Sequence, residues 1–195
     1  MENLIIPIIK QQKAKELHEF ISYWSSFYDY PNDSLYNGCI WKSQFERNDI
    51  LNLYVWKNGM RLSKQKQLSL EEKVLPKLIL INKLKEEGSL DLNFFFNEFK
   101  SVSSVWKIFL LHIIKPNQFP IYDQHIHRAF LFIQGLDYSK ISNDTISEKE
   151  KLVFYQESYL PYIKENNVTD LKKQDEAFFA FGQFLKTRNY EKFFV

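Results

Sequence analysis

The residues best suited to chemistry lie in one segment of this 195-residue chain, and the first of them is Lys107. Apolar residues from Val102 to Ile114 leave almost no polar face around it, which predicts a helix buried on most sides. Ser103 or Ser104 can cap the start of that helix, so we expect Lys107 in or near its first turn. The helix dipole and partial desolvation there both favour the neutral amine, which is a nucleophile. The alternative is a lysine whose stem covers apolar surface while its ammonium reaches water.

A second candidate, Asp123, follows a connection bracketed by Pro116 and Pro120 and directly precedes an apolar helical run. It is therefore placed to cap a helix. A carboxylate in this position either serves only as a cap or stabilises positive charge in a transition state. His125 and Arg128 follow within one turn, where they either orient Asp123 and bind a phosphate or simply pack and pair on the helix.

The stretch from Tyr122 to Ala129, YDQHIHRA, resembles the segment that carries the catalytic aspartate of the helix-hairpin-helix DNA glycosylases. This superfamily includes endonuclease three and oxoguanine DNA glycosylase, and the resemblance covers Ser101–Gly135. In the family a helical hairpin precedes the aspartate, and in bifunctional members its second helix begins with a nucleophilic lysine, the position that Lys107 matches. The run Asp175–Lys186 is similar to the final helix of oxoguanine-glycosylase-fold proteins, which borders the base pocket.

The chain departs from the family at the hairpin turn. The family's turn is rich in glycine and holds a phosphate with its backbone amides, whereas the segment 100–104 contains no glycine. An anion can here be bound only by the hydroxyls of Ser103 and Ser104 and by the N-terminus of the following helix.

The resemblance implies a DNA glycosylase that flips a damaged or modified base out of double-stranded DNA and excises it. Breaking the N-glycosidic bond builds positive charge on the sugar, which Asp123 would stabilise from beside the anomeric carbon. Lys107 would attack that carbon and leave a Schiff base, which permits strand cleavage; if Lys107 points elsewhere, Asp123 would activate water instead. The resemblance requires neither a cofactor nor a metal. The excised base would be either a damaged base in the cell's own genome or a modified base in the DNA of an invading phage.

A base pocket requires stacking rings and hydrogen-bonding edges. We expect its lining among Phe178, Phe179, Gln183 and Trp41; the alternative for each is packing in the core.

Two other classes of function compete with this one. A non-catalytic helical DNA-binding or protein-interaction module is the alternative if the fold has lost its chemistry. A metal-dependent hydrolase drawn from His112, Asp123, His125 and His127 is disfavoured, because residues two apart on a helix point to roughly opposite sides.

The elements that must position these residues are helical nearly throughout, which predicts an all-α fold. Ser69 with Glu72 indicates a long helix that ends at Gly88, and Ser147 with Glu150 indicates a second capping box. Thr169 or Asp170 can open the last helix. We expect one compact domain, residues 1–195, with helical lobes of roughly 1–98 and 99–195 and a groove between them.

The composition of the chain limits the classes of protein to which it can belong. Hydrophobic residues make up 45% of the chain and charged residues 26%, as in globular proteins, and the single Cys39 cannot form an internal disulfide. No apolar run is long enough for a membrane span, so we expect a cytoplasmic protein, acting as a monomer. The net charge of +2 is mild, but the acid-free stretch 50–70 carries a basic set that either binds DNA or forms a solvated helix face: Lys57, Arg61, Lys64 and Lys66.

Overall fold

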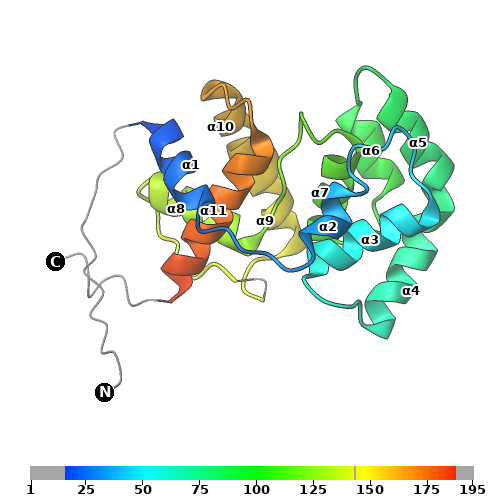
Figure 1. Cartoon of the computed structure of the whole chain (residues 1–195), viewed down its shortest axis with the longest axis horizontal. Coiled ribbons are helices and arrows are strands. Elements are labelled where there is room, and N and C mark those ends of the chain that lie inside the picture. The colour runs from blue at the N-terminus through cyan, green and yellow to red at the C-terminus, as the bar shows by residue number, and fades with distance from the viewer. Residues whose placement is uncertain (1–15, 143, 188–195) are drawn as a thin grey trace.

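The computed structural model describes residues 16–142 and 144–187, and every regular element within them is a helix (Figure 1). The expectation of an all-α chain is therefore confirmed. The elements are α1 (Leu17–Ser25), α2 (Asp33–Asn37), α3 (Arg47–Asn58), α4 (Lys64–Lys73), the 3₁₀ turn η1 (Leu75–Lys77), α5 (Leu78–Glu86), α6 (Leu92–Glu98), α7 (Ser104–Ile114), α8 (Gln124–Ile133), α9 (Glu148–Val153), the π-helical turn η2 (Phe154–Tyr159), α10 (Leu160–Glu165) and α11 (Leu171–Lys186). None of these described helices combines the length and the apolar composition that a membrane span requires.

The helices form two groups, with α2 to α7 on one side of the molecule and α1 with α8 to α11 on the other (Figure 1). This grouping differs from the expected lobes 1–98 and 99–195. Helix α1 packs on α11 because its apolar rings meet those of the last helix: Phe20 and Trp24 lie 5.0 Å and 4.8 Å from Phe181, measured between ring centroids. Helix α7 contacts both α5 and α9, which explains why its sequence is apolar on nearly every side.

The long helix expected from Ser69 to Gly88 is wrong. Helix α4 begins earlier, after Ser63, whose hydroxyl accepts a hydrogen bond from the Lys66 amide at 3.3 Å. The chain then turns through η1, which contains Pro76, before α5 begins. Because proline has no amide hydrogen and its ring clashes with the preceding turn, it interrupts the regular α-helix at this position.

Three helix starts agree with the expectations. The Asp123 carboxylate accepts a hydrogen bond from the His125 amide at 2.9 Å and caps α8. Ser147 and Glu150 form the expected reciprocal capping box of α9, and the Asp170 carboxylate caps α11. Each cap joins residues two or three apart, so the local sequence is enough to specify it.

Helices α8 and α11 lie in unusually close contact, and this contact positions the site. A Cβ atom added to Gly182 on α11 would lie 1.9 Å from the His125 carbonyl oxygen on α8, so no larger residue fits there. The buried Arg128 reinforces the contact by donating to the Gly182 carbonyl at 3.1 Å and to the Ile141 carbonyl at 2.5 Å. The two helices that carry Asp123 and Phe179 are thereby held together.

Candidate functional site

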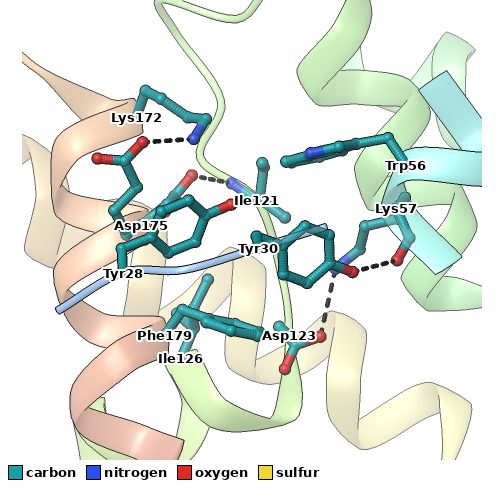
Figure 2. A pocket seen from close by; sticks show the side chains of 11 residues that line it. Tyr28, Tyr30, Trp56, Lys57, Ile121, Asp123, Ile126, Lys172, Asp175 and Phe179 are labelled. Carbon is teal, nitrogen blue, oxygen red and sulfur yellow. Dashed lines mark hydrogen bonds and ion pairs between the residues drawn. The ribbon is translucent and has the colours of Figure 1, made fainter. Parts of the chain in front are cut away.

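A pocket opens between the two groups of helices (Figure 2). The α1–α2 link, the end of α3, the α7–α8 connection and one face of α11 converge on it. Its cavity volume is about 30 Å³, which is room for about two water molecules and far below the volume of a typical small-molecule site. The lining residues are Tyr28, Tyr30, Trp56, Lys57, Ile121, Asp123, Ile126, Lys172, Asp175, Glu176 and Phe179.

Asp123 provides negative charge at one end of the pocket. Its Oδ2 lies 3.3 Å from Nζ of Lys57, and its side chain is 23% exposed. Burial opposes the charge, but the Lys57 ammonium, the His125 side chain and the amide that Asp123 caps together outweigh it and hold the pKa of Asp123 below its ordinary value. At neutral pH this carboxyl group is ionised.

Aromatic rings form the walls beside Asp123. Tyr30 meets Phe179 edge-to-face at 5.4 Å between ring centroids and Trp56 at the same distance, while Tyr28 lies 5.9 Å from Phe179. The Tyr30 hydroxyl donates to the Lys57 carbonyl at 3.2 Å, and burial raises the pKa of Tyr30 to about 12. The phenol therefore keeps its proton, and its ring is tied to α3.

Polar side chains of α11 close the opposite end (Figure 2). Lys172 pairs with Glu176 at 2.6 Å, and its ammonium lies 4.6 Å from the centre of the Tyr28 ring. Asp175 accepts hydrogen bonds from the Ile121 amide at 2.7 Å and from the Tyr159 hydroxyl at 3.1 Å. Burial raises the pKa of Asp175 to about 8, so this carboxyl is mostly protonated at neutral pH.

Lys107 is buried as expected but does not line this pocket. Its ammonium lies 6.0 Å from the centre of the Phe96 ring. Desolvation lowers the pKa of Lys107, and the nearby Glu148 carboxylate partly opposes that effect. The structure thus brings Asp123 together with Lys57, a residue expected only to bind DNA, and not with the expected nucleophile.

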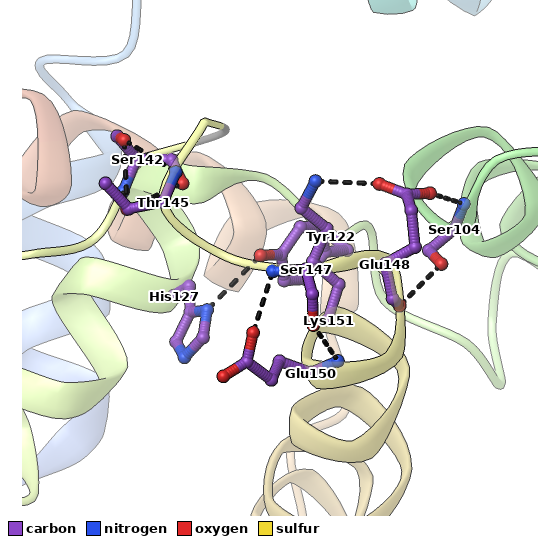
Figure 3. Close-up of polar contacts among 9 residues, drawn as sticks. All are labelled: Ser104, Tyr122, His127, Ser142, Thr145, Ser147, Glu148, Glu150 and Lys151. Atoms are coloured by element: carbon purple, nitrogen blue, oxygen red, sulfur yellow. Dashed lines mark hydrogen bonds and ion pairs between the residues drawn. The ribbon is translucent and has the colours of Figure 1, made fainter.

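The N-terminus of α7 already holds an anion, and that anion belongs to the protein (Figure 3). Glu148 accepts a hydrogen bond from the Ser104 amide at 2.5 Å, and its carbonyl accepts one from the Ser104 hydroxyl at 2.7 Å. Ser103 occupies the N-cap position without a hydroxyl cap. Lys151 pairs with the same carboxylate at 2.8 Å. The place that the sequence indicated for an external anion is therefore taken by Glu148.

His125 and Arg128 serve the packing of α8 in this structure. Arg128 is 5% exposed and donates to Nδ1 of His125 at 3.0 Å, in addition to the two carbonyls described above. The His125 ring lies 5.1 Å from that of Phe179. Desolvation lowers the pKa of His125 despite the nearby Asp123 carboxylate. These contacts match the expectation that His125 and Arg128 pack and pair on the helix, rather than the alternative that they orient Asp123 and bind a phosphate.

The four residues expected to line a base pocket fall in different places. Phe179 lines the pocket. Phe178, its neighbour, is fully buried in the core, because adjacent helical residues point about 100° apart. Gln183 is exposed, and Trp41 is 64% exposed; neither is among the lining residues.

The basic set divides in the same way. Arg61, Lys64 and Lys66 are exposed on and before α4, whereas the Lys57 side chain is only 7% exposed and faces the pocket. Asn58, the residue after Lys57, bonds to the exposed basic segment: its side-chain oxygen accepts from the Lys66 ammonium at 2.5 Å, and its amide nitrogen donates to the Arg61 carbonyl at 3.2 Å.

Sequence reasoning missed most of the lining. Lys172, Asp175, Glu176 and Phe179 recur at three- and four-residue steps, which places them on one face of a helix. A helix face that carries both charged side chains and an aromatic ring could have indicated a binding site on this helix. The approach of Tyr28 and Tyr30 to that face had no comparable signal, because it depends on contacts between distant segments.

The histidines considered for a metal site are separated. His112 is fully buried between the Tyr36 hydroxyl, 2.6 Å away, and the Phe119 carbonyl, and burial lowers its pKa to about 3. His127 stacks on Phe154 at 3.6 Å between ring centroids. Within residues 16–142 and 144–187, no group of three or more His, Cys, Asp or Glu side chains is arranged to hold a metal ion.

Comparison with known proteins yielded no match to a family, to a curated protein or to a solved structure. The function of the chain must therefore be argued from the site. At one end of this narrow aromatic pocket lie the ionised Asp123 carboxylate and the Lys57 amine, and at the other end lie the hydrogen-bonding side chains of α11.

Proposed function

We propose that this protein is a DNA N-glycosylase that excises a damaged or modified base from double-stranded DNA. The observation that carries the proposal is the position of Asp123, an ionised carboxylate at the edge of an aromatic pocket. Loss of a base leaves positive charge on the sugar, and a fixed carboxylate beside the anomeric carbon lowers the energy of that transition state.

The remaining pocket residues suit a flipped base. Tyr30 and Phe179 offer ring faces for stacking once they separate, because in the present arrangement their rings are in contact. Lys172 and Glu176 offer a donor and an acceptor to the edge of the base. With the base between the rings and its edge toward α11, the sugar would lie at Asp123. The exposed Arg61, Lys64 and Lys66 supply positive charge for the phosphate backbone.

The experiment is a base-release assay with defined modified duplexes and modified phage genomes, in which free bases are identified by mass spectrometry. Asp123→Asn should lower release by at least about 100-fold, because the amide keeps a capping oxygen but carries no charge. Asp170→Asn is the matched control: it makes the same change at the N-cap of α11, at a residue that does not line the pocket, and should release base like the wild type. Circular dichroism checks that both variants are folded.

Release by Asp123→Asn within a few-fold of the wild type would remove Asp123 from the mechanism. If the wild-type protein binds duplex DNA but releases no base from any substrate, the protein is a non-catalytic DNA-binding module instead.

A further inference from the structure

The pocket contains amines that the sequence did not assign to chemistry. Among the lining residues these are Lys57 and Lys172. Lys172 is paired with Glu176 at 2.6 Å and lies over the Tyr28 ring, at the end of the pocket formed by α11. Lys57 Nζ lies 3.3 Å from Oδ2 of Asp123. An atom positioned beside the Asp123 carboxylate is therefore also within reach of the Lys57 amine.

The surroundings of Lys57 position and desolvate its amine. The side chain is 7% exposed and extends from the last turn of α3. The preceding residue, Trp56, is buried and donates to Asp33 at 2.7 Å, while the Lys57 carbonyl accepts from the Tyr30 hydroxyl. The Lys57 amine is thus shielded from water and placed beside Asp123, and an amine in this position can act as a nucleophile once it has given up its proton.

Lys107, the expected nucleophile, faces a different part of the molecule. Its ammonium lies over Phe96 and near Glu148, and Lys107 is absent from the pocket lining.

We propose that Lys57 is the catalytic amine of this pocket and that it gives the protein abasic-site lyase activity through a Schiff base with the C1′ carbon of the sugar. The inference rests on the proposed function, because it requires a deoxyribose to lie at Asp123. The substrate of the lyase step is an abasic site in duplex DNA, whether left by excision at this pocket or formed beforehand.

The chemistry balances with the groups present. The Lys57 ammonium first gives a proton to the Asp123 carboxylate, and the free amine adds to the C1′ aldehyde of the open abasic sugar. The carbinolamine then takes that proton back and loses water to give an iminium ion. Asp123 stabilises that cation and is placed to exchange protons with Nζ. A water molecule then removes a C2′ proton, a C2′=C3′ double bond forms as the bond between C3′ and its phosphate oxygen breaks, and the phosphate leaves as an anion, so the strand is cut. Hydrolysis of the imine afterwards frees Lys57. No oxidant or reductant takes part.

The experiment uses the full chain and a duplex with one abasic site, so it does not depend on knowing the excised base. Sodium borohydride should reduce the iminium ion and trap a covalent protein–DNA adduct, and peptide mapping by mass spectrometry should place the adduct on Lys57. Lys57→Met should reduce adduct formation and strand cleavage to background. Lys107→Met, the same change at a buried lysine that does not line the pocket, should retain both. Lys57→Arg keeps a cation beside Asp123 but cannot form the imine, so it should also give no adduct.

An adduct mapped to Lys57 supports the inference even if a variant fails to fold. An adduct on Lys107, on the N-terminal amine or on any other residue overturns it, as does the absence of an adduct with wild-type protein. Base release without an adduct would mean that the protein is a monofunctional glycosylase. The proposed function would then stand, and only the catalytic role of Lys57 would fail. Failure of both assays would remove both proposals.

Discussion

Two aspartates, Asp123 and Asp175, line the same pocket and have opposite protonation states. Asp123 touches a lysine and caps a helix, so its pKa is lowered and it is ionised. Asp175 is buried deeper, and desolvation outweighs its two hydrogen bonds and the more distant charges of Lys172 and Lys57, so its pKa is raised to about 8. The pairing of a charged and a neutral carboxyl in one site is the usual result of such unequal environments. An additional negative charge, on Asp175, is thus kept out of the pocket at neutral pH.

The raised pKa of Asp175 makes a pH-dependent contribution to stability. The unfolded chain releases this proton near pH 4, whereas the folded chain holds it until about pH 8, so the group destabilises the fold progressively as the pH rises between these values. Asp175→Asn removes this effect. We therefore expect the stability of Asp175→Asn relative to the wild type to increase from pH 4 to pH 8, by up to about 1.4 kcal/mol per pH unit.

Urea unfolding of both proteins at several pH values measures this difference. Other titrating groups, such as His112 and His127, are common to both proteins and cancel in the comparison. A difference in stability that stays constant from pH 4 to pH 8 would show that Asp175 is ionised in the folded state.

Among the helices, the close contact of α8 with α11 holds the site together. Helix α8 begins at Asp123, and α11 carries Lys172, Asp175 and Phe179. Gly182 lets the two backbones approach, and Arg128 bonds across the contact. Anything that separates these helices also separates the carboxylate from the ring that faces it.

Gly182→Ala should therefore damage both stability and activity. The added methyl group would collide with the His125 backbone at 1.9 Å, which cannot yield as a flexible side chain would, so we expect a loss of about 1–3 kcal/mol in unfolding free energy. Base release should fall more than the fraction of folded protein does. Gly88→Ala is the control, because a Cβ there meets nothing within 4 Å, and it should unfold within about 1 kcal/mol of the wild type. Equal urea midpoints for the two variants would mean that the helices are free to move apart.

Across the molecule as a whole, the basic surface and the pocket are adjacent along the chain. Arg61, Lys64 and Lys66 are exposed in the segment that follows Lys57, and Asn58 bonds to that segment. A duplex bound to this surface would present its sugar–phosphate backbone near the residues that follow Lys57. The net charge of +2 is too small to attract DNA by itself, so the location of the charge decides the interaction.

Replacing Arg61, Lys64 and Lys66 together with Gln should weaken binding to all duplexes, whatever their sequence. The slope of log affinity against log salt concentration should flatten by about 0.9 for each phosphate that the protein no longer neutralises. Fluorescence anisotropy across a salt series measures this slope. A control triple of the exposed residues Lys83, Lys149 and Lys164 removes the same charge from other surfaces and should change the slope less. Equal slopes for both triples would place the DNA-binding face elsewhere.

Features that depend on nearby residues could be predicted from the amino-acid order alone. Helical periodicity predicted an all-α chain, and the caps at Asp123, Ser147 and Asp170 are correct because each bonds to an amide two or three residues away. The burial of α7 followed from its apolar composition. The expected helix from Ser69 to Gly88 failed on two local signals: Ser63 rather than Ser69 caps α4, and the turn that contains Pro76 separates α4 from α5, because proline removes a backbone donor.

Which side chains meet, by contrast, depends on how the helices pack. The sequence correctly indicated that Lys107 is buried, but the direction of its amine depends on how α7 is rotated within its packing. Lys57 reaches Asp123 because α3 and the start of α8 converge, although the two residues lie far apart in the chain. Likewise, Phe179 faces the pocket and Phe178 the core because of the orientation of α11. Such contacts arise from the packing of complete helices, so no local spacing in the sequence encodes them.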